Sequence, residues 1–367
     1  MLERYGHGGD LESAAEIYGR GAFLDFSANI NPLGPPPGVM EKLRDALPAV
    51  IRYPDPGHRG LKELLSVRLG VRPEQLCIGN GAAECMALIL LACRPRKVGI
   101  VEPCFSEYRQ LSEQFGAEVQ SVYGTRNNGW RAGAGEIEKL LRAVDLLFIG
   151  QPNNPNGIQY DREVLRRLAG AAERCGTYLV IDEAFIDFIP DKDRQTLLPE
   201  LARYPRTMLV RSMTKFYAIP GLRLGFAAAH PDLVQAMTGK QVTWSVNGLA
   251  LLAGEACLQS GEGYERDTIN LITEQRGLLA AGLRKLGCDV TEGEANFLLA
   301  GLPAPWTAEK MQTEMGRRGV LIRSCAMYPG LGREHIRVAV KTHADNTRLL
   351  DIMGEVIAGT PPRNVGS

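Results

Sequence analysis

Residues 146–182 decide the fold: they read Leu146-Leu-Phe-Ile149, then a polar turn, then the helical pattern Arg162–Cys175, then Tyr178-Leu-Val-Ile-Asp182. Neither apolar run alternates with polar residues, which is typical of strands that are buried on both faces. A helix between two such strands is the connection that parallel strands require. The stretch therefore predicts an α/β fold built on a parallel sheet.

The same alternation continues on both sides of this stretch. We expect further strands at residues 76–78, 98–101, 118–122, 207–210 and 224–229, with helices at 61–69, 83–93, 105–115 and 137–141. Strands that alternate with helices predict a sheet covered by helices on both faces. We therefore expect a large domain over residues 41–260 with a mostly parallel sheet.

The pattern changes after a long helical region that runs from residue 249 to about residue 286. Beyond it we expect strands at 289–290, 297–300, 320–323 and 335–340, with helices at 308–318 and 345–357. These elements predict a smaller α+β domain, which we assign to residues 261–367 together with 1–40.

Composition excludes several classes of protein. Of the 367 residues 45% are hydrophobic and 23% are charged, which excludes a mainly disordered chain. Lys+Arg and Asp+Glu both total 42, so the net charge is zero. Proteins that bind nucleic acid usually carry a basic excess, and we expect no such partner.

Membrane and metal signals are equally weak. The longest nearly apolar stretch, Cys85 to Cys93, is far shorter than the roughly 20 residues of a spanning helix. The first residues resemble no secretory signal, so we expect a cytoplasmic protein without a membrane partner. The eight cysteines form no Cys-x-x-Cys pair and the five histidines are scattered. We expect reduced thiols and no metal.

Polar side chains collect where the expected strands end, and in α/β sheets ligands bind there. Gly79-Asn-Gly-Ala-Ala-Glu84 opens a helix and is either a plain turn or a site for a phosphate. Asn154 is a turn residue or an amide donor. Asp182 is a hydrogen-bonding strand end or the partner of a buried cation. Lys215 is an exposed lysine or a partly desolvated amine that forms a Schiff base.

Further donors follow the strand that precedes Lys215. Ser212, Thr214 and Arg223 are each a capping or surface residue, or together a set of donors to one anion. Four strand ends thus carry groups that suit one small anionic ligand.

In combination these motifs resemble a known family. The series Asn154-Pro-Asn-Gly157, Asp182-Glu-Ala-Phe185, Ser212-Met-Thr-Lys215 and Gly221-Leu-Arg-Leu-Gly225 is similar to the fold-type I pyridoxal-phosphate enzymes of the aspartate-aminotransferase superfamily. The resemblance covers residues from about 25 to 340. It implies pyridoxal 5′-phosphate as cofactor.

The resemblance also implies a role for each matching residue. Lys215 forms the Schiff base and moves protons, and Asp182 keeps the pyridine nitrogen protonated. The remaining cofactor contacts implied are Asn154 to the ring 3-oxygen, Phe105 stacked on the ring, and a phosphate site of Gly81, Ala82, Ala83, Ser212, Thr214 and Arg223. Tyr53 resembles the tyrosine that reaches the neighbouring subunit's site, which implies a homodimer. One position departs from the pattern, since many relatives have Tyr where this chain has Phe185.

Two subfamilies are close, the threonine-phosphate decarboxylases of cobalamin biosynthesis and the histidinol-phosphate aminotransferases. The stretches His7-Gly-Gly9, Asp25-Phe-Ser-Ala-Asn-Ile-Asn-Pro-Leu-Gly34 and Thr214-Lys-Phe-Tyr-Ala-Ile-Pro-Gly-Leu-Arg223 look more like the decarboxylases. We therefore expect decarboxylation of O-phospho-L-threonine to (R)-1-amino-2-propanol O-2-phosphate and CO2. Transamination of histidinol phosphate is the alternative.

A phosphorylated amino acid needs sites for a carboxylate and a phosphate. By the same resemblance we expect these contacts from His7, Asn31, Arg323 and Arg337. Which arginine takes which anion stays open, because a guanidinium group suits both.

Overall fold

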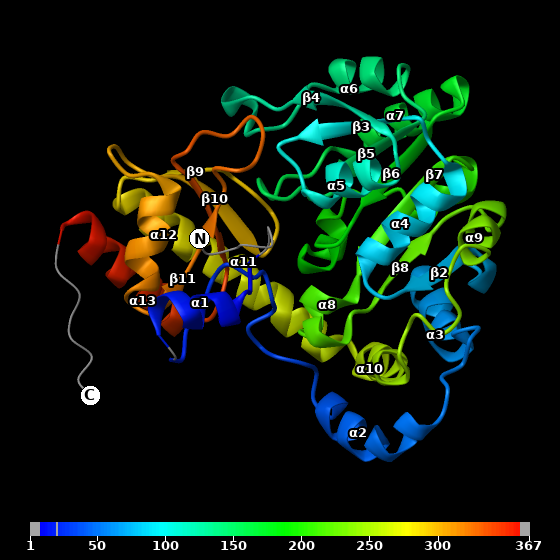
Figure 1. Ribbon diagram of the computed structural model, residues 1–367, viewed down its shortest axis with the longest axis horizontal. Helices are drawn as coiled ribbons and strands as arrows, with labels where there is room; N and C mark the ends of the chain where they lie inside the picture. Colours follow the sequence, from blue (N-terminus) through cyan, green and yellow to red (C-terminus); the bar gives the residue numbers. More distant parts are fainter. Residues whose placement is uncertain (1–7, 20, 360–367) are drawn as a thin grey trace.

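The computed structural model describes residues 8–19 and 21–359, and its centre is a seven-stranded sheet (Figure 1). The strand order is β2-β8-β7-β6-β5-β3-β4. In chain order the strands are β2 (Leu76–Gly79), β3 (Lys97–Glu102), β4 (Glu118–Tyr123), β5 (Leu146–Gly150), β6 (Tyr178–Asp182), β7 (Thr207–Ser212) and β8 (Gly225–Ala228). β3 to β7 pair in parallel, whereas β8 runs antiparallel to both neighbours. The predicted α/β fold with a mostly parallel sheet is confirmed.

Both faces of this sheet are buried, which explains the lack of polar alternation in its strands. In β5, Leu146 and Phe148 belong to one apolar cluster, and Leu147 and Ile149 belong to the cluster on the opposite face. The first cluster includes side chains of α4 (Ala82–Cys93), α5 (Glu107–Gln114) and α9 (Pro231–Thr238). The second includes side chains of α3 (Arg59–Leu69), α6 (Ala134–Leu141), α7 (Arg162–Cys175) and α10 (Gly248–Gln259).

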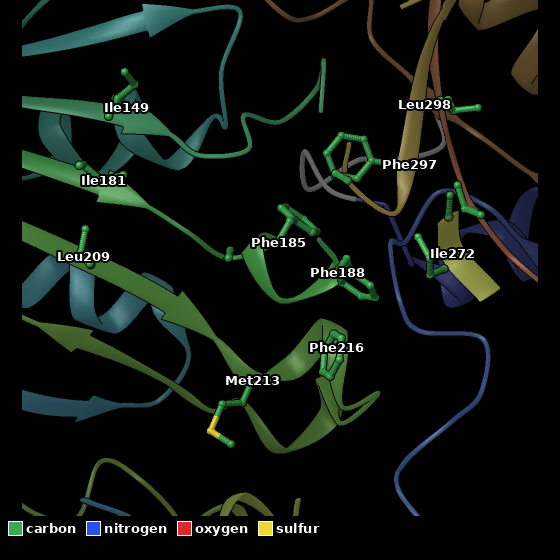
Figure 2. Packing of buried hydrophobic residues seen from close by; sticks show 14 of the residues in the cluster. Ile149, Ile181, Phe185, Phe188, Leu209, Met213, Phe216, Ile272, Phe297 and Leu298 are labelled. Atoms are coloured by element: carbon green, nitrogen blue, oxygen red, sulfur yellow. The ribbon is translucent and has the colours of Figure 1, made fainter. Parts of the chain in front are cut away.

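The second cluster continues past the ends of the strands. Figure 2 shows Ile149, Ile181 and Leu209 along three neighbouring strands. Beyond the strands, the Phe185 ring meets the Phe297 ring edge-on at 4.9 Å between centroids. This contact ties the end of β6 to the C-terminal part of the chain.

That C-terminal part holds a four-stranded antiparallel sheet. Its order is β12 (Arg323–Ser324), β13 (His335–Ala339), β10 (Phe297–Gly301), β9 (Asp289–Val290). The helices around it are α11 (Glu262–Lys285), α12 (Ala308–Gly316), α13 (His343–Ile357) and the N-terminal α1 (Leu11–Tyr18), which Figure 1 shows grouped away from the large sheet. β1 (Leu24–Asp25) pairs in parallel with β11 (Val320–Leu321), so the N-terminal segment joins this part. The division at residues 40/41 and 260/261 stays a prediction.

Two predicted elements are each split in two by the structure. The long helical region is α10 and α11, which are separated at Gly261, whose φ is +84°. The strand expected at 320–323 is β11 and β12, because the two halves pair with different partners, β1 and β13. Among the residues described, no helix is long and apolar enough to cross a membrane.

Candidate functional site

A cavity of about 590 Å³ lies between the ends of the large sheet and the antiparallel sheet. Nine of the residues predicted for the site line it: Ala82, Ala83, Phe105, Asn154, Asp182, Lys215, Arg223, Arg323 and Arg337. These residues come from segments up to 255 positions apart (82 to 337). The fold therefore brings these nine predicted residues, from both the cofactor set and the substrate set, to one cavity.

Lys215 lies on α8 (Met213–Phe216), a four-residue helix that follows β7 directly. Ser212 caps this helix, and the Lys215 Nζ atom lies 3.2 Å from the Ser212 Oγ atom. Burial lowers the pKa of Lys215 to about 8, although the nearby Asp182 carboxylate opposes the shift. A substantial fraction of this amine is therefore neutral near pH 8, as a nucleophilic lysine requires.

Asp182 ends β6 at the floor of the cavity. The Tyr108 hydroxyl donates to its Oδ2 atom at 2.7 Å, and the Ala184 N–H donates to Oδ1 at 3.0 Å. Burial raises the pKa of Asp182, and these two hydrogen bonds act in the opposite direction. The carboxylate is thus held in one orientation.

Tyr108 is a site residue that the sequence interpretation missed. It lies on α5 three positions after Phe105, and the two rings meet edge-on with centroids 5.8 Å apart. Phe105 precedes the first turn of α5, so helical spacing does not pair the two residues and only the fold brings the rings together. Its ring also stacks on Phe148 at 5.1 Å, which fixes the hydroxyl toward Asp182.

The predicted phosphate site lies at the start of α4. Gly81 has φ +80°, and a Cβ atom there would lie 2.9 Å from the Arg223 Nη2 atom. A Cβ atom on Gly225 would lie 2.5 Å from the Ala82 nitrogen, so glycine permits this close approach of two loops. The N-terminus of α4 therefore faces the cavity together with a guanidinium group, which suits an anion.

Gly81, Ser212 and Thr214 lie close behind the cavity rather than on its lining. The Ser212 and Thr214 hydroxyl oxygens are 2.7 Å apart and both side chains are buried. Ser212 contacts the Lys215 amine directly, whereas the Thr214 hydroxyl contacts Ser212.

Arg323 and Arg337 form the opposite wall. They are register partners on β12 and β13, and both are buried. The Arg337 Nη1 atom donates to Asn154 Oδ1 at 2.6 Å and Nη2 donates to the Ser27 carbonyl at 2.8 Å. Its Nε atom has no hydrogen-bond partner in the described part of the chain. Two opposed buried cations repel one another, so a bound anion would stabilise this wall.

The N-terminal segment contributes Asn29 rather than the predicted Asn31. Asn29 lines the cavity, is 5% exposed, and its Oδ1 atom has no hydrogen-bond partner among residues 8–19 and 21–359. In place of the expected substrate contact, Asn31 points away from the cavity and uses its amide on Phe216, Tyr264 and Thr268. The Asn-x-Asn spacing fits both residues, and only the fold shows which one reaches the cavity.

Two further predicted residues lie apart from the cavity. Tyr53 is 79% exposed and stacks on Trp244 with ring centroids 4.2 Å apart. His7 lies outside the described residues, although Gly8 and Gly9, which follow it, line the cavity.

Phe185, the departure from the family pattern, also lines the cavity. The Lys215 Nζ atom lies 5.8 Å from the centre of its ring. The ring supplies no hydroxyl, so Phe185 adds no hydrogen-bond donor to the cavity; the Asn154 amide lines the same cavity.

A larger cavity, of about 760 Å³, lies elsewhere in the fold and holds none of the predicted residues. Its buried cation, Arg211, is paired with Glu183 at 2.8 Å, and Arg68 is paired with Glu265. Since these two cations are already paired within the protein, and none of the predicted residues lies there, it is the weaker candidate. The described residues contain no cluster of side chains suited to a metal.

The chain matches the family model for aminotransferase class I and II over residues 22–353. The chain belongs to this family. It is 37% identical over 364 residues to the threonine-phosphate decarboxylase of Salmonella typhimurium, covering 97% of this chain and 98% of the relative. It is 34% identical over 360 residues to a histidinol-phosphate aminotransferase of Symbiobacterium thermophilum, covering 96% and 95%.

A solved structure of a related protein has the same fold as this chain. The histidinol-phosphate aminotransferase from Clostridium acetobutylicum superposes with a TM-score of 0.85 at 29% identity, covering 91% of this chain and 99% of that chain. The predicted family is confirmed.

The family depends on pyridoxal 5′-phosphate, which confirms the predicted cofactor. The cavity fits this group on its own geometry. It offers an amine whose pKa is lowered, a buried carboxylate for a pyridinium nitrogen, and a helix N-terminus with Arg223 for the phosphate.

Proposed function

We propose that this chain decarboxylates O-phospho-L-threonine to (R)-1-amino-2-propanol O-2-phosphate and CO2, a reaction of cobalamin biosynthesis. The observation that carries the proposal is the pair of buried arginines, Arg323 and Arg337, in the same cavity as Lys215. A substrate with a carboxylate and a phosphate would neutralise both. The likeness to the Salmonella decarboxylase supports this substrate.

Three side chains hold the cofactor in this proposal. Lys215 would supply the amine that bonds to it, Asp182 would accept a hydrogen bond from its protonated ring nitrogen, and Phe105 would cover its ring; all three side chains line the cavity. When bound, pyridoxal phosphate supplies an electron sink for the bond that breaks. Asn154 would contact the 3-oxygen of the ring, and its Oδ1 atom accepts a hydrogen bond from the Arg337 Nη1 atom at 2.6 Å.

We assign the substrate carboxylate to Arg337, because this side chain is fixed beside Asn154, one of the proposed cofactor contacts. Arg323 would take the phosphate. The unpartnered Oδ1 atom of Asn29 is an acceptor, so it suits an N–H group of the substrate amine rather than the phosphate. With both anions held in this way, the two arginines would orient the substrate for loss of CO2 from Cα rather than of a proton. Lys215 or water returns a proton to the same carbon, which balances the loss of CO2.

The alternative is transamination of histidinol phosphate, which the 34% identity to the Symbiobacterium aminotransferase favours. The same lysine, aspartate and arginines serve both reactions. What differs is the bond that the protein orients for cleavage, Cα–CO2 or Cα–H.

A product assay separates the two. Purified protein loaded with pyridoxal phosphate is given phosphothreonine alone, and CO2 and amine are measured. We expect both without any 2-oxo acid, and no product with Lys215→Ala. Turnover of histidinol phosphate that requires 2-oxoglutarate, with no CO2 from phosphothreonine, would replace the decarboxylase by the aminotransferase.

We also propose that the chain forms a homodimer. Large apolar side chains are exposed in two segments, where Ile51 is 85% exposed: Met40, Leu47, Val50, Ile51 and Tyr53 in one, Val242 and Trp244 in the other. The Tyr53 ring stacks on the Trp244 ring, which brings the two segments together. A monomer gains nothing from exposing such a patch. In the proposed dimer Tyr53 reaches the partner's phosphate site. Ile51→Glu places a charge among the exposed apolar side chains and should give a monomer in sedimentation. Cofactor binding should then weaken, because each site loses the partner's tyrosine. A monomeric wild type would disprove the dimer.

The cytoplasmic location stays a prediction.

A further inference from the structure

The turn that carries Lys215 is too short to hold itself in place. α8 has only four residues, and short helices are unstable without outside contacts. The carbonyl groups of the last turn of a helix also lack partners within the helix. The position of the Lys215 side chain therefore depends on whatever binds the end of α8.

Asn31 binds that end at two points. Its backbone N–H donates to the carbonyl of Lys215 itself at 3.1 Å, and its Nδ2 atom donates to the Phe216 carbonyl at 2.8 Å. The side chain is 3% exposed, so these bonds are shielded from water. The Ala218 N–H also reaches the Lys215 carbonyl, at 3.3 Å, from within the same turn.

Asn31 is in turn fixed from α11. Its Nδ2 atom lies 2.8 Å from the Tyr264 hydroxyl and 2.8 Å from the Thr268 hydroxyl, and its Oδ1 atom accepts from the Leu33 N–H at 3.0 Å. The Tyr264 hydroxyl also lies 3.0 Å from the Phe216 carbonyl. One buried amide thus joins the N-terminal segment, α11 and the end of α8.

We infer that Asn31 is a positioning residue for Lys215: it caps α8 and so sets where the lysine amine meets the cofactor. The inference rests on the role proposed for Lys215 but not on the identity of the substrate. It gives Asn31 a part in the site without contact to substrate or cofactor. Asn29, two residues earlier, lines the cavity beside Arg323 and Arg337. The same segment therefore connects this side of the cavity to the helix that carries Lys215.

The test follows how fast the apoprotein takes up pyridoxal phosphate, measured by absorbance, and how that absorbance depends on pH once loaded. We expect Asn31→Ala to slow uptake about tenfold or more and to shift the pH midpoint, since small displacements of a reacting group are costly. In turnover, kcat should fall while KM changes little. A wild type that loads the cofactor but releases no CO2 would disprove the decarboxylase and leave this test intact.

The matched control is Asn346→Ala. Asn346 is also 3% exposed, and its amide bonds to the Lys341 carbonyl at 2.9 Å and to Gln275 at 3.3 Å, in a different part of the chain. If Asn31 only stabilises the fold, both variants should lower the melting temperature and neither should change the rate of cofactor uptake. Uptake and pH midpoint equal to wild type in Asn31→Ala would therefore overturn the inference.

A milder variant covers the case in which Asn31→Ala does not fold. Tyr264→Phe keeps Asn31 and removes the hydroxyl that contacts the Asn31 amide, the Phe216 carbonyl and the Gly34 carbonyl. It should slow uptake in the same direction by a smaller factor, about two- to fivefold. Unchanged uptake in this variant would count against the inference.

Discussion

The two walls of the cavity are built in different ways. The cofactor wall follows neighbouring strands of the large sheet and holds Asn154, Asp182 and Lys215. The substrate wall holds Asn29, Arg323 and Arg337, which come from the N-terminal segment and the antiparallel sheet.

The hydrogen bonding of the two walls differs as well. On the cofactor wall, Asp182 already accepts two hydrogen bonds and Lys215 donates to Ser212. On the substrate wall, the Asn29 Oδ1 and Arg337 Nε atoms are buried without a partner in the part of the chain that the structure describes. Unmet buried groups cost free energy until a ligand binds them.

This difference suggests a division of labour. A wall whose groups are already oriented suits a group that stays bound, whereas unmet groups suit a ligand that enters and leaves. Changes on the cofactor wall should therefore alter cofactor absorbance and kcat. Changes on the substrate wall should raise KM and leave the absorbance intact.

The largest effect is expected for Asp182→Asn. The neutral amide keeps the shape but no longer stabilises a protonated ring nitrogen, so kcat should fall about 10³-fold and the absorbance should change. Steady-state kinetics and spectra measure both. Tyr108→Phe is the control, because it removes only the 2.7 Å hydrogen bond and should cost about tenfold. Wild-type kcat in Asp182→Asn would remove this residue from the site.

Arg337→Met should lower kcat/KM for phosphothreonine about 100-fold, mainly through KM, since a buried charged contact to the carboxylate is lost. The cofactor absorbance should persist. Arg276→Met is a matched control: Arg276 donates to the Glu294 carbonyl at 2.8 Å but does not line the cavity. It should reduce stability without changing KM. A KM unaffected by Arg337→Met would place the carboxylate site elsewhere.

The cofactor wall could be predicted from the sequence, because strand ends in a parallel sheet meet at one edge. Four strand-end motifs between residues 79 and 225 were enough to bring Asp182 and Lys215 together. Tyr108 was missed, since it lies within a helix and only the fold brings its hydroxyl to Asp182.

The substrate wall depends on pairings between distant residues, which the sequence does not specify. Arg323 and Arg337 were predicted from motifs, but their opposition requires the register of β12 on β13. The sequence predicted Asn31 in the cavity, whereas Asn29 lies there, for the same reason. The Asn31 amide is held by residues of α11 and by the end of α8, which are distant in the sequence. The split of residues 320–323 into two strands is likewise decided by partners far along the chain.

Lys215→Met should stabilise the apoprotein by about 3 kcal/mol at pH 7, since each unit of lowered pKa corresponds to about 1.4 kcal/mol. The pKa of Lys215 is lowered to about 8 from 10.5, so the unfolded chain binds more protons between these values. The stability of the wild type therefore rises with pH across this window, and the advantage of the variant should shrink there. Thermal unfolding at several pH values measures this, with the exposed Lys285→Met as control. An advantage that is constant with pH would contradict the lowered pKa.

Asn29→Ala should give the smallest effect and the clearest separation of the walls. Its amide makes no hydrogen bond within residues 8–19 and 21–359 that would be lost, so the melting temperature should stay the same or rise slightly. The substrate, however, loses one partner, and kcat/KM should fall about tenfold through KM. Asn31→Ala should do the reverse, lowering stability and kcat, because its amide is fully used inside the protein. If Asn29→Ala instead lowered stability and left KM unchanged, the unmet amide would have no ligand, and the contrast between the two walls would fail at this residue.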